Sequence, residues 1–195
     1  MWDERYSQQE YVYGTEPNDF LKQHADYIPK GKVLCLAEGE GRNAVYLASL
    51  GYEVTAVDSS QVGLDKAKRL AKEKGVVIEC ICADLNEFDL GQDQWQGVVS
   101  IFCHLPPPVR HKVHQQISPC LRSGGVLLLE GYTEQQLNYG TGGPQVKEMM
   151  MSAPELESTF PELNIKLNQE IERNIFEGLF HTGDGHVVQF IAQKP

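Results

Sequence analysis

Short apolar runs alternate along most of the chain with segments whose apolar residues recur at helical spacing. The runs predict strands at Lys32–Ala37, Glu53–Val57, Val76–Ile81, Gly97–Phe102 and Gly125–Glu130. The periodic segments predict helices at Arg42–Leu50, from Ser59 or Ser60 to about Lys74, and at Val109–Leu121. Strands that alternate with helices, several of them apolar on both faces, are typical of an α/β fold. We expect a doubly wound, mostly parallel sheet between two helix layers.

The two ends of the chain depart from this alternation. Near the C-terminus, Ile165–Phe180 and His186–Gln193 are strand-like, and Thr182–Gly185 between them has the composition of a turn. We therefore expect a β-hairpin that adds an antiparallel strand to the sheet. Residues 1–30 concentrate aromatic side chains without a clear strand, which predicts an N-terminal arm or a lid ahead of a domain at 31–195.

Charge and composition narrow the range of partners. The formal net charge of −10 disfavours nucleic acid, because such a surface repels phosphates. No apolar run is long enough to span a membrane, and Met1–Arg5 does not resemble the start of a secretory leader. The five cysteines are scattered through apolar runs, which favours buried thiols in a reducing cytoplasm. His111 and His114 have no further ligands at metal-site spacing, so no metal is expected; the pattern leaves the oligomeric state open.

A glycine-rich turn joins the first predicted strand to the first predicted helix. It reads Glu38-Gly39-Glu40-Gly41-Arg42-Asn43-Ala44, and its glycines allow a tight turn and close approach of a ligand to the backbone. Asp58 ends the next strand, where it either accepts hydrogen bonds from ribose hydroxyls or caps the following helix with Ser59. Asp84, two residues after Cys82, either accepts from an adenine amino group or closes a turn.

The order of these elements resembles that of the class I S-adenosylmethionine-dependent methyltransferases, over nearly the whole chain from Gly31. The chain is most similar to the small tellurite-resistance and thiopurine-type branch of that family. The motifs behind this resemblance are Trp2-Asp3-Glu4-Arg5-Tyr6, Tyr13-Gly14-Thr15-Glu16-Pro17, Gly39-Glu40-Gly41-Arg42-Asn43-Ala44 and Gly140-Thr141-Gly142-Gly143-Pro144. The resemblance implies a Rossmann-like seven-stranded sheet with its last strand antiparallel, and S-adenosyl-L-methionine as the cofactor bound by residues 31–195.

The resemblance also implies roles for individual residues. From the methionine end of the cofactor through the ribose and adenine to the methyl sulfonium, the candidate binding residues are Ala37, Glu38, Gly39, Gly41, Asp58, Ser59, Asp84, Leu85, Phe102 and Cys103. The family usually has an aspartate in the first strand, where this chain has Cys35. We hypothesise that Glu38 supplies the missing carboxylate.

Methyl transfer mainly requires the protein to align the donor and the acceptor and to exclude water. A soft nucleophile such as a thiolate or a reduced chalcogen species needs no general base. His104 ends the fourth strand and is the candidate base or substrate-orienting donor; alternatively, it caps backbone groups before the prolines. Trp2, Tyr13, Tyr139 and Gly143 are candidates for a substrate-covering lid. His181 and His186 flank the predicted hairpin turn and are expected to face solvent; the alternative for His181 is a place at the border of the pocket.

Two further functional classes stay open at this point. Gly39-x-Gly41-x-x-Ala44 also fits the fingerprint of an NAD(P)-dependent oxidoreductase. A non-catalytic cofactor-binding protein on the same fold is the third possibility. The leading prediction is methyl transfer to a small-molecule acceptor.

Overall fold

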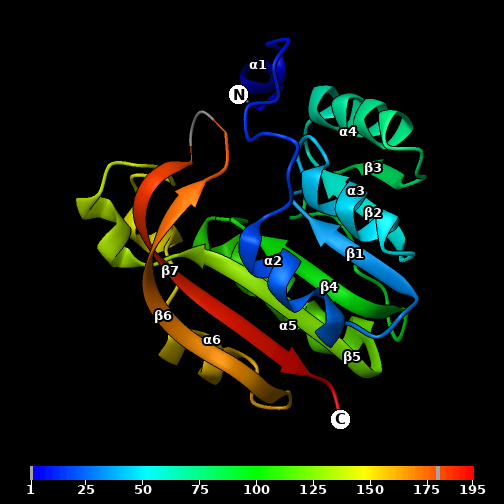
Figure 1. Ribbon diagram of the computed structural model, residues 1–195. Coiled ribbons are helices and arrows are strands. Elements are labelled where there is room, and N and C mark those ends of the chain that lie inside the picture. The colour runs from blue at the N-terminus through cyan, green and yellow to red at the C-terminus, as the bar shows by residue number, and fades with distance from the viewer. Residues whose placement is uncertain (1, 179–180) are drawn as a thin grey trace.

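A computed structural model describes residues 2–178 and 181–195. The strands form one seven-stranded sheet in the order β3-β2-β1-β4-β5-β7-β6 (Figure 1). Strands β1 to β5 are mutually parallel, and β7 is antiparallel to both of its neighbours. This arrangement confirms the predicted fold class and the antiparallel last strand. The strands are β1 (Lys32–Leu36), β2 (Glu53–Asp58), β3 (Glu79–Cys82), β4 (Trp95–Ile101), β5 (Leu121–Tyr132), β6 (Asn164–Phe176) and β7 (Thr182–Gln193).

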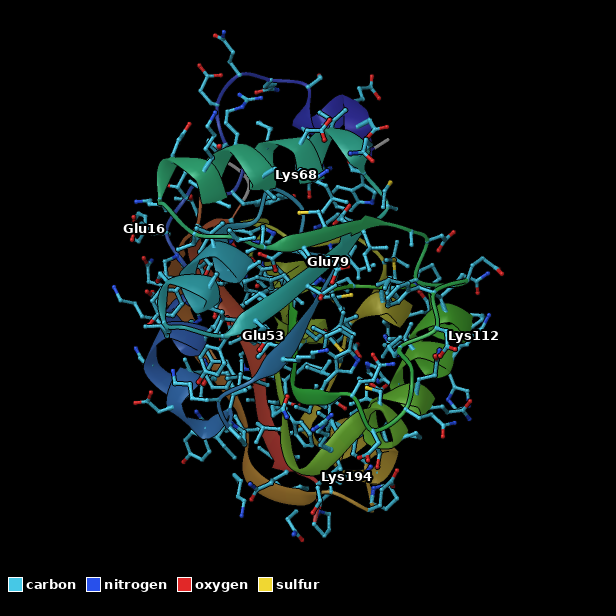
Figure 2. The ribbon with its side chains drawn as sticks, turned by 90° about the vertical axis from the view of Figure 1, so that its right-hand side faces the viewer. Glu16, Glu53, Lys68, Glu79, Lys112 and Lys194 are labelled. Carbon is cyan, nitrogen blue, oxygen red and sulfur yellow. The ribbon has the colours of Figure 1, made fainter. Side chains whose placement is uncertain are left out.

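Helices cover both faces of the sheet. The α-helices are α1 (Trp2–Tyr6), α2 (Asp19–His24), α3 (Arg42–Ser49), α4 (Gln61–Glu73), α5 (Pro107–Cys120) and α6 (Ala153–Thr159), and the 3₁₀ helices are η1 (Ala25–Tyr27), η2 (Glu134–Asn138) and η3 (Lys147–Met149). One core joins α2, α3 and α4 to the strands, and the other joins α5 and α6 to the opposite face. Lys68 on α4 and Lys112 on α5 lie on the outside of these layers (Figure 2).

Strand β1 shows why the sheet needs both layers. Val33 and Cys35 belong to the core on one face, and Leu34 and Leu36 belong to the core on the other. All four side chains are almost completely buried. A strand with apolar residues at every position is stable only where helices cover both faces of the sheet.

Among the element boundaries that differ from the sequence predictions, two have a clear physical reason. Strand β3 begins at Glu79 and not at Val76, because Val76 is drawn into the end of α4 by its N–H bond to Ala71 and Val77 is 90% exposed. The segment Thr182–Gly185 lies in β7 and not in the turn, since it pairs with the end of β6 from Arg173 to Phe176. The part of the predicted strand at residues 179–180 lies outside the described residues.

Part of the first thirty residues packs into the core. Phe20, Leu21, Ala25 and Ile28 are buried in the core that contains α3 and one face of the sheet. The division into a segment at 1–30 and a domain at 31–195 stays a prediction. The part of the N-terminal segment that extends beyond this core precedes α2 and lies beside α4 at the carboxyl edge of the parallel strands (Figure 1). In the described part of the chain, no helix combines the length and the apolarity needed to cross a membrane.

Candidate functional site

The glycine loop between β1 and α3 lies at the carboxyl edge of the sheet. Its backbone adopts left-handed conformations at Ala37 (φ +49°), Gly39 (φ +60°) and Gly41 (φ +89°). A Cβ on Gly41 would lie 2.5 Å from the Cβ of Ala67 on α4, and a Cβ on Gly39 would lie 2.6 Å from the phenol oxygen of Tyr6. Glycine is therefore required at both positions, for its conformation and for close packing.

Glu38 lies at the start of α3, where it satisfies the helix terminus. Its Oε1 accepts a 2.7 Å hydrogen bond from the Ala44 N–H, and burial raises the pKa of its carboxyl to about 7. Cys35 lies on β1, three residues before Glu38. Its thiol is fully buried, and burial raises the thiol pKa well above the usual value. Cys35 offers no charge, and Glu38 follows β1 two residues after its end, close to the place where the hypothesis requires a carboxylate. Its hold on a cofactor amino group stays a prediction.

Asp58 connects the glycine loop to α4. Its Oδ2 accepts the Gly39 N–H and its Oδ1 accepts the Ser60 N–H, each at 2.8 Å. The helix cap is Ser60, whose hydroxyl accepts the Gly63 N–H, while Ser59 is exposed. Burial raises the Asp58 pKa, and the backbone N–H groups oppose that rise. Each carboxylate oxygen keeps a further lone pair, so the capping geometry leaves room for the predicted ribose contact.

Asp84 and Leu85 follow β3 at the same edge. Asp84 is exposed, and its Oδ1 accepts the Asn86 N–H at 2.8 Å, which closes a turn. The Leu85 side chain is buried in the core between the sheet and α5. Asp58 pairs with Cys82 between β2 and β3, so Asp84 and Leu85 follow the residue that lies beside Asp58. The Leu85 side chain is buried.

The end of β4 is strained and tightly held. Phe102 has φ +51°, a conformation rare outside glycine, and its N–H donates to the Glu130 carbonyl at 2.8 Å. Cys103 is buried, and burial raises its thiol pKa to about 12, so it is a neutral core residue. Strain of this kind is typical of ligand-contacting positions, which agrees with the predicted place of Phe102.

Both ring nitrogens of His104 contact the backbone. Its Nε2 accepts the Tyr132 N–H at 2.9 Å, and its Nδ1 lies 3.2 Å from the Phe102 carbonyl oxygen, to which an Nδ1–H would donate. Burial lowers the His104 pKa to about 4, so the ring is neutral at pH 7. This geometry favours the second alternative from the sequence, in which His104 caps backbone groups; a catalytic role stays a prediction.

A cluster of aromatic rings extends from His104 across the end of the sheet. The ring centroids of Phe102 and Tyr132 are 4.6 Å apart, and both rings contact His181 at 4.7 and 5.5 Å. Tyr13 reaches the same histidine at 4.7 Å. We call Tyr13, Phe102, His104, Tyr132 and His181 the aromatic cluster. It unites the ends of β4 and β5, the N-terminal segment and the start of β7.

Tyr132 was missed by the sequence analysis. The available signal was its place at the carboxyl end of β5, after a continuous apolar run and one residue beyond the level of Phe102 on the neighbouring β4. The ring is fully buried. Of the predicted lid residues, Gly143 contacts this ring directly, because a Cβ on it would lie 2.6 Å from Tyr132 Cδ2.

The other predicted lid residues lie farther out. Trp2 is 43% exposed and stacks on Tyr6 at 5.8 Å, so Tyr6 and not Trp2 covers the glycine loop. Tyr139 donates a 2.5 Å hydrogen bond to Glu172 Oε2, which ties it to β6. The structure therefore brings Tyr13 and Gly143 to the aromatic cluster, while Trp2 and Tyr139 lie at its periphery.

A buried ion pair fastens the N-terminal segment over the glycine loop. Lys66 Nζ lies 2.5 Å from Glu40 Oε1 and also donates to the carbonyl oxygens of Tyr6, Gln8 and Glu10. The other Glu40 oxygen accepts the Val12 N–H at 2.8 Å. The N-terminal segment is thus held in place by an ion pair between Glu40 of the loop and Lys66 of α4. Both side chains of this pair are buried.

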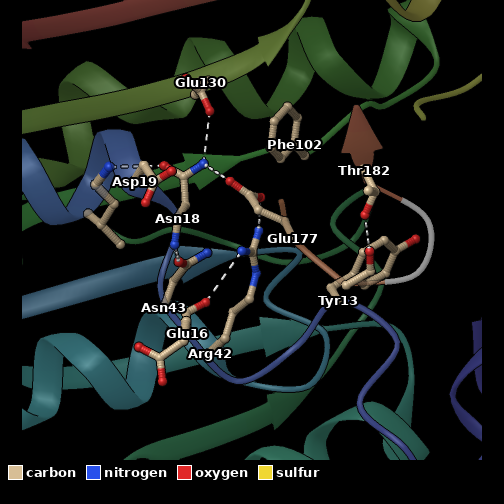
Figure 3. Close-up of polar contacts among 12 residues, drawn as sticks. Tyr13, Glu16, Asn18, Asp19, Arg42, Asn43, Phe102, Glu130, Glu177 and Thr182 are labelled. Atoms are coloured by element: carbon tan, nitrogen blue, oxygen red, sulfur yellow. Dashed lines mark hydrogen bonds and ion pairs between the residues drawn. The ribbon is translucent and has the colours of Figure 1, made fainter. Parts of the chain in front are cut away.

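A second buried network joins the same segment to the hairpin (Figure 3). Asn18 Nδ2 donates to Glu130 and to Glu177, each at 2.8 Å. Arg42 pairs with Glu177 at 2.5 Å, and Arg173 pairs with Glu130 at 2.5 Å. The two carboxylates are therefore matched by two guanidinium groups, and the network orients α3, β5 and the end of β6 relative to one another. Among the described residues, no group of three or more His, Cys, Asp or Glu side chains could hold a metal.

Comparisons with known proteins agree with this geometry. Residues 33–125 match the family model of a methyltransferase domain. An uncharacterized methyltransferase of Bacillus subtilis (strain 168), YbaJ, is 33% identical over 77 residues, which are 38% of this chain and 30% of YbaJ. The chain therefore spans less than a third of the length of that curated relative.

Solved structures match over a larger part of the chain. TehB from Haemophilus influenzae aligns with a TM-score of 0.74 and 18% identity over 100% of this chain and 66% of TehB. A second structure comes from work on the conversion of a disulfide bond into a thioacetal group during echinomycin biosynthesis. It aligns with a TM-score of 0.76 and 18% identity, over 98% of this chain and 87% of that protein. At this identity the structural matches show the fold, and the comparisons do not favour the oxidoreductase alternative. The methyltransferase resemblance stated from the sequence is confirmed over residues 33–125, and the chain has the fold of the S-adenosylmethionine-dependent methyltransferases.

Proposed function

We propose that this protein transfers a methyl group from S-adenosyl-L-methionine to a soft nucleophile on a small molecule, such as a thiol or a chalcogen species. The observation that carries the proposal is the pairing of the glycine loop with Asp58. A buried carboxylate accepts from Gly39 N–H at 2.8 Å, beside two glycines that no other residue can replace. This combination at the edge of parallel strands suits a nucleoside cofactor.

The residues of the loop divide the binding task. Gly39 and Gly41 allow the left-handed turns of the loop that we assign to the amino-acid end of the cofactor, and the Glu38 carboxylate offers a counter-charge to its ammonium group. Asp58 offers acceptors to the ribose, and Phe102 lies at the end of β4 where the acceptor would approach. When bound, S-adenosylmethionine supplies a methyl group on a sulfonium centre that an acceptor displaces in line, without a covalent bond to the protein.

The protonation states of the site support a soft acceptor. His104 is neutral with both nitrogens engaged, Cys103 is a neutral thiol, and burial lowers the pKa of His181 to about 3. None of these three groups is a good proton acceptor at pH 7, when basicity is judged by pKa. A thiolate or a hydrochalcogenide is already ionised and needs no base. The echinomycin-related structure, whose description names sulfur chemistry, lends further support by analogy.

A thermal-shift panel tests the cofactor first. S-adenosylmethionine and S-adenosylhomocysteine, each at 100 times Kd, should stabilise the protein by ~2.7 kcal/mol, which is roughly 5–10 °C at this size. NAD and NADP should give no shift. A shift with the nicotinamide cofactors alone would contradict the proposal, and no shift with any of them would favour a protein without this cofactor.

Glu38→Gln then tests the ammonium contact. Because burial raises the Glu38 pKa to about 7, wild-type affinity for S-adenosylmethionine should rise with pH between about 5.5 and 7.5. The variant should bind more weakly at pH 7.5 and lose this dependence. Unchanged affinity in Glu38→Gln would remove the assignment of Glu38.

Methyl transfer should be measured with thiophenol, 2-mercaptoethanol and sodium selenide, against aniline and catechol as nitrogen and oxygen acceptors. The proposal requires faster turnover of the sulfur and selenium compounds. Turnover confined to aniline or catechol would contradict the acceptor class while leaving the cofactor assignment intact.

A further inference from the structure

Two buried polar atoms in the aromatic cluster have no hydrogen-bond partner among the described residues. They are the phenol oxygen of Tyr132, whose side chain is fully buried, and Nδ1 of His181, which is only 9% exposed. A buried polar group without a partner costs about 1–3 kcal/mol, and native proteins seldom leave two of them together. The ring centroids are 5.5 Å apart, so the two atoms belong to the same small region.

The rings around these atoms are apolar or neutral. Phe102 lies against both, with ring centroids 4.6 Å from Tyr132 and 4.7 Å from His181, and the Tyr13 ring lies 4.7 Å from His181. Polarizable atoms such as sulfur make favourable contacts with aromatic rings. A ligand held here would therefore meet two neutral polar groups inside an aromatic wall.

The carboxylates near the two atoms are paired with arginines. Glu130 and Glu177, the carboxylates that approach Tyr132, are engaged by Arg173 and Arg42. The charged groups with the largest effect on His181 are arginines, and they disfavour its protonation. A neutral imidazole and a neutral phenol can each donate one hydrogen bond to an anion without adding a charge.

The cluster is continuous with the glycine loop. The rings of Tyr13 and Tyr6 are 6.3 Å apart, and the Tyr6 phenol oxygen lies 2.6 Å from the point where a Cβ on Gly39 would stand. Phe102, at the end of β4, joins the cluster from the sheet side. A ligand at Tyr132 and His181 would thus be next to the place proposed for the cofactor.

We propose that Tyr132 and His181 form the acceptor-binding pair, in which Tyr132 Oη–H and His181 Nδ1–H donate hydrogen bonds to a thiolate or hydrochalcogenide anion enclosed by the rings of Phe102 and Tyr13. The inference rests on the proposed methyltransferase function and extends it to the residues that select the acceptor. The pair orients the nucleophile and stabilises its negative charge. It neither accepts nor releases a proton during transfer, and the new carbon–sulfur or carbon–selenium bond replaces the bond from the methyl group to the sulfonium.

The test compares Tyr132→Phe and His181→Phe with the wild type in thiophenol and sodium selenide methylation. Loss of one hydrogen bond to an anion should lower kcat/KM for the acceptor by roughly 10-fold to 100-fold. His181→Asn should recover most of this loss, because its amide N–H occupies nearly the position of Nδ1–H. The dissociation constant of S-adenosylmethionine, measured by calorimetry, should change by less than about twofold in all three variants.

Tyr52→Phe is the matched control. Its phenol is buried but donates to the Ala25 and Ile28 carbonyl oxygens, so the variant should lose stability and keep its acceptor kinetics. Tyr132→Phe should show the reverse, with an unchanged or higher Tm because it removes a phenol oxygen that has no partner.

The outcomes separate the two proposals. Wild-type kcat/KM in Tyr132→Phe and His181→Phe, with normal cofactor binding, overturns the pair and leaves the proposed function standing. A wild-type protein that binds no S-adenosylmethionine overturns both. Equal losses of Tm in Tyr132→Phe and Tyr52→Phe would show that the Tyr132 phenol is structurally engaged, and would also refute the pair.

Discussion

Replacement of Lys66 by methionine removes the cation that fastens the N-terminal segment over the glycine loop. Lys66 is 3% exposed, and its ammonium group contacts Glu40 and three carbonyl oxygens of residues 6–10. The variant keeps the length of the side chain and leaves the Glu40 carboxylate buried without its partner. Such a loss typically costs about 3–5 kcal/mol if the surrounding structure stays closed.

The protein can avoid part of this cost by releasing the segment. A detached segment exposes Glu40 to water and recovers about 1–2 kcal/mol of backbone entropy for each residue freed, against the lost burial of Tyr6 and Val12. A cost of 3–5 kcal/mol carried by the whole fold would lower Tm by about 7–12 °C. We expect a smaller decrease, together with rapid hydrogen exchange at the Val12 amide, which donates to Glu40 in the wild type.

The assay is hydrogen exchange followed by mass spectrometry, alongside calorimetric melting. Lys68→Met is the control on the same helix, since Lys68 is exposed and lies 3.9 Å from the equally exposed Asp65, and it should change neither readout. The double variant Glu40→Gln, Lys66→Met should regain protection at Val12, because no unpaired charge is left. Identical exchange in Lys66→Met and Lys68→Met would refute the reasoning, and full protection with a loss of 7–12 °C would show that the segment is not a separable unit.

Three further predictions concern the loop and the buried titratable groups. Gly41→Ala should abolish cofactor binding and destabilise the fold by about 1–3 kcal/mol, measured by urea unfolding, because its Cβ would meet Ala67 at 2.5 Å in a left-handed conformation. Burial raises the Glu38 pKa to about 7, so the native state binds the proton more tightly, and the unfolding free energy should fall as pH rises from about 4.5 to 7; Glu38→Gln should lack this fall. Burial lowers the His114 pKa to about 4, so the unfolded state binds the proton first, and stability should fall as pH drops from about 6.5 towards 4; His114→Phe should lose less stability than the wild type in acid.

The order of strands and helices was readable in the sequence because local patterns determine it. Continuous apolar runs such as Val126–Leu129 require cover on two faces, and Gly39 and Gly41 mark the turn between β1 and α3. Asp58 and Asp84 were predicted at one edge of the sheet because the carboxyl ends of parallel strands share that edge, and Phe102 was predicted from the family resemblance. The start of β3 could not be predicted, because a strand and the end of α4 compete for the same residue. Valine favours a strand, but the Val76 N–H donates to the Ala71 carbonyl oxygen at the end of α4.

The partners of individual side chains were decided only by the tertiary structure. His104 stands at the predicted place, yet contact with the Tyr132 N–H, 28 residues away, occupies the nitrogen that a base would use. Glu40 stands between two glycines in the sequence, and the structure shows that it pairs with Lys66, which binds the backbone of the N-terminal segment. The sequence by itself determined the fold, the glycine loop and the acidic residues at the sheet edge. Burial and long-range contacts, which depend on how distant segments pack, decided which charged and polar groups are paired and which are left for a ligand.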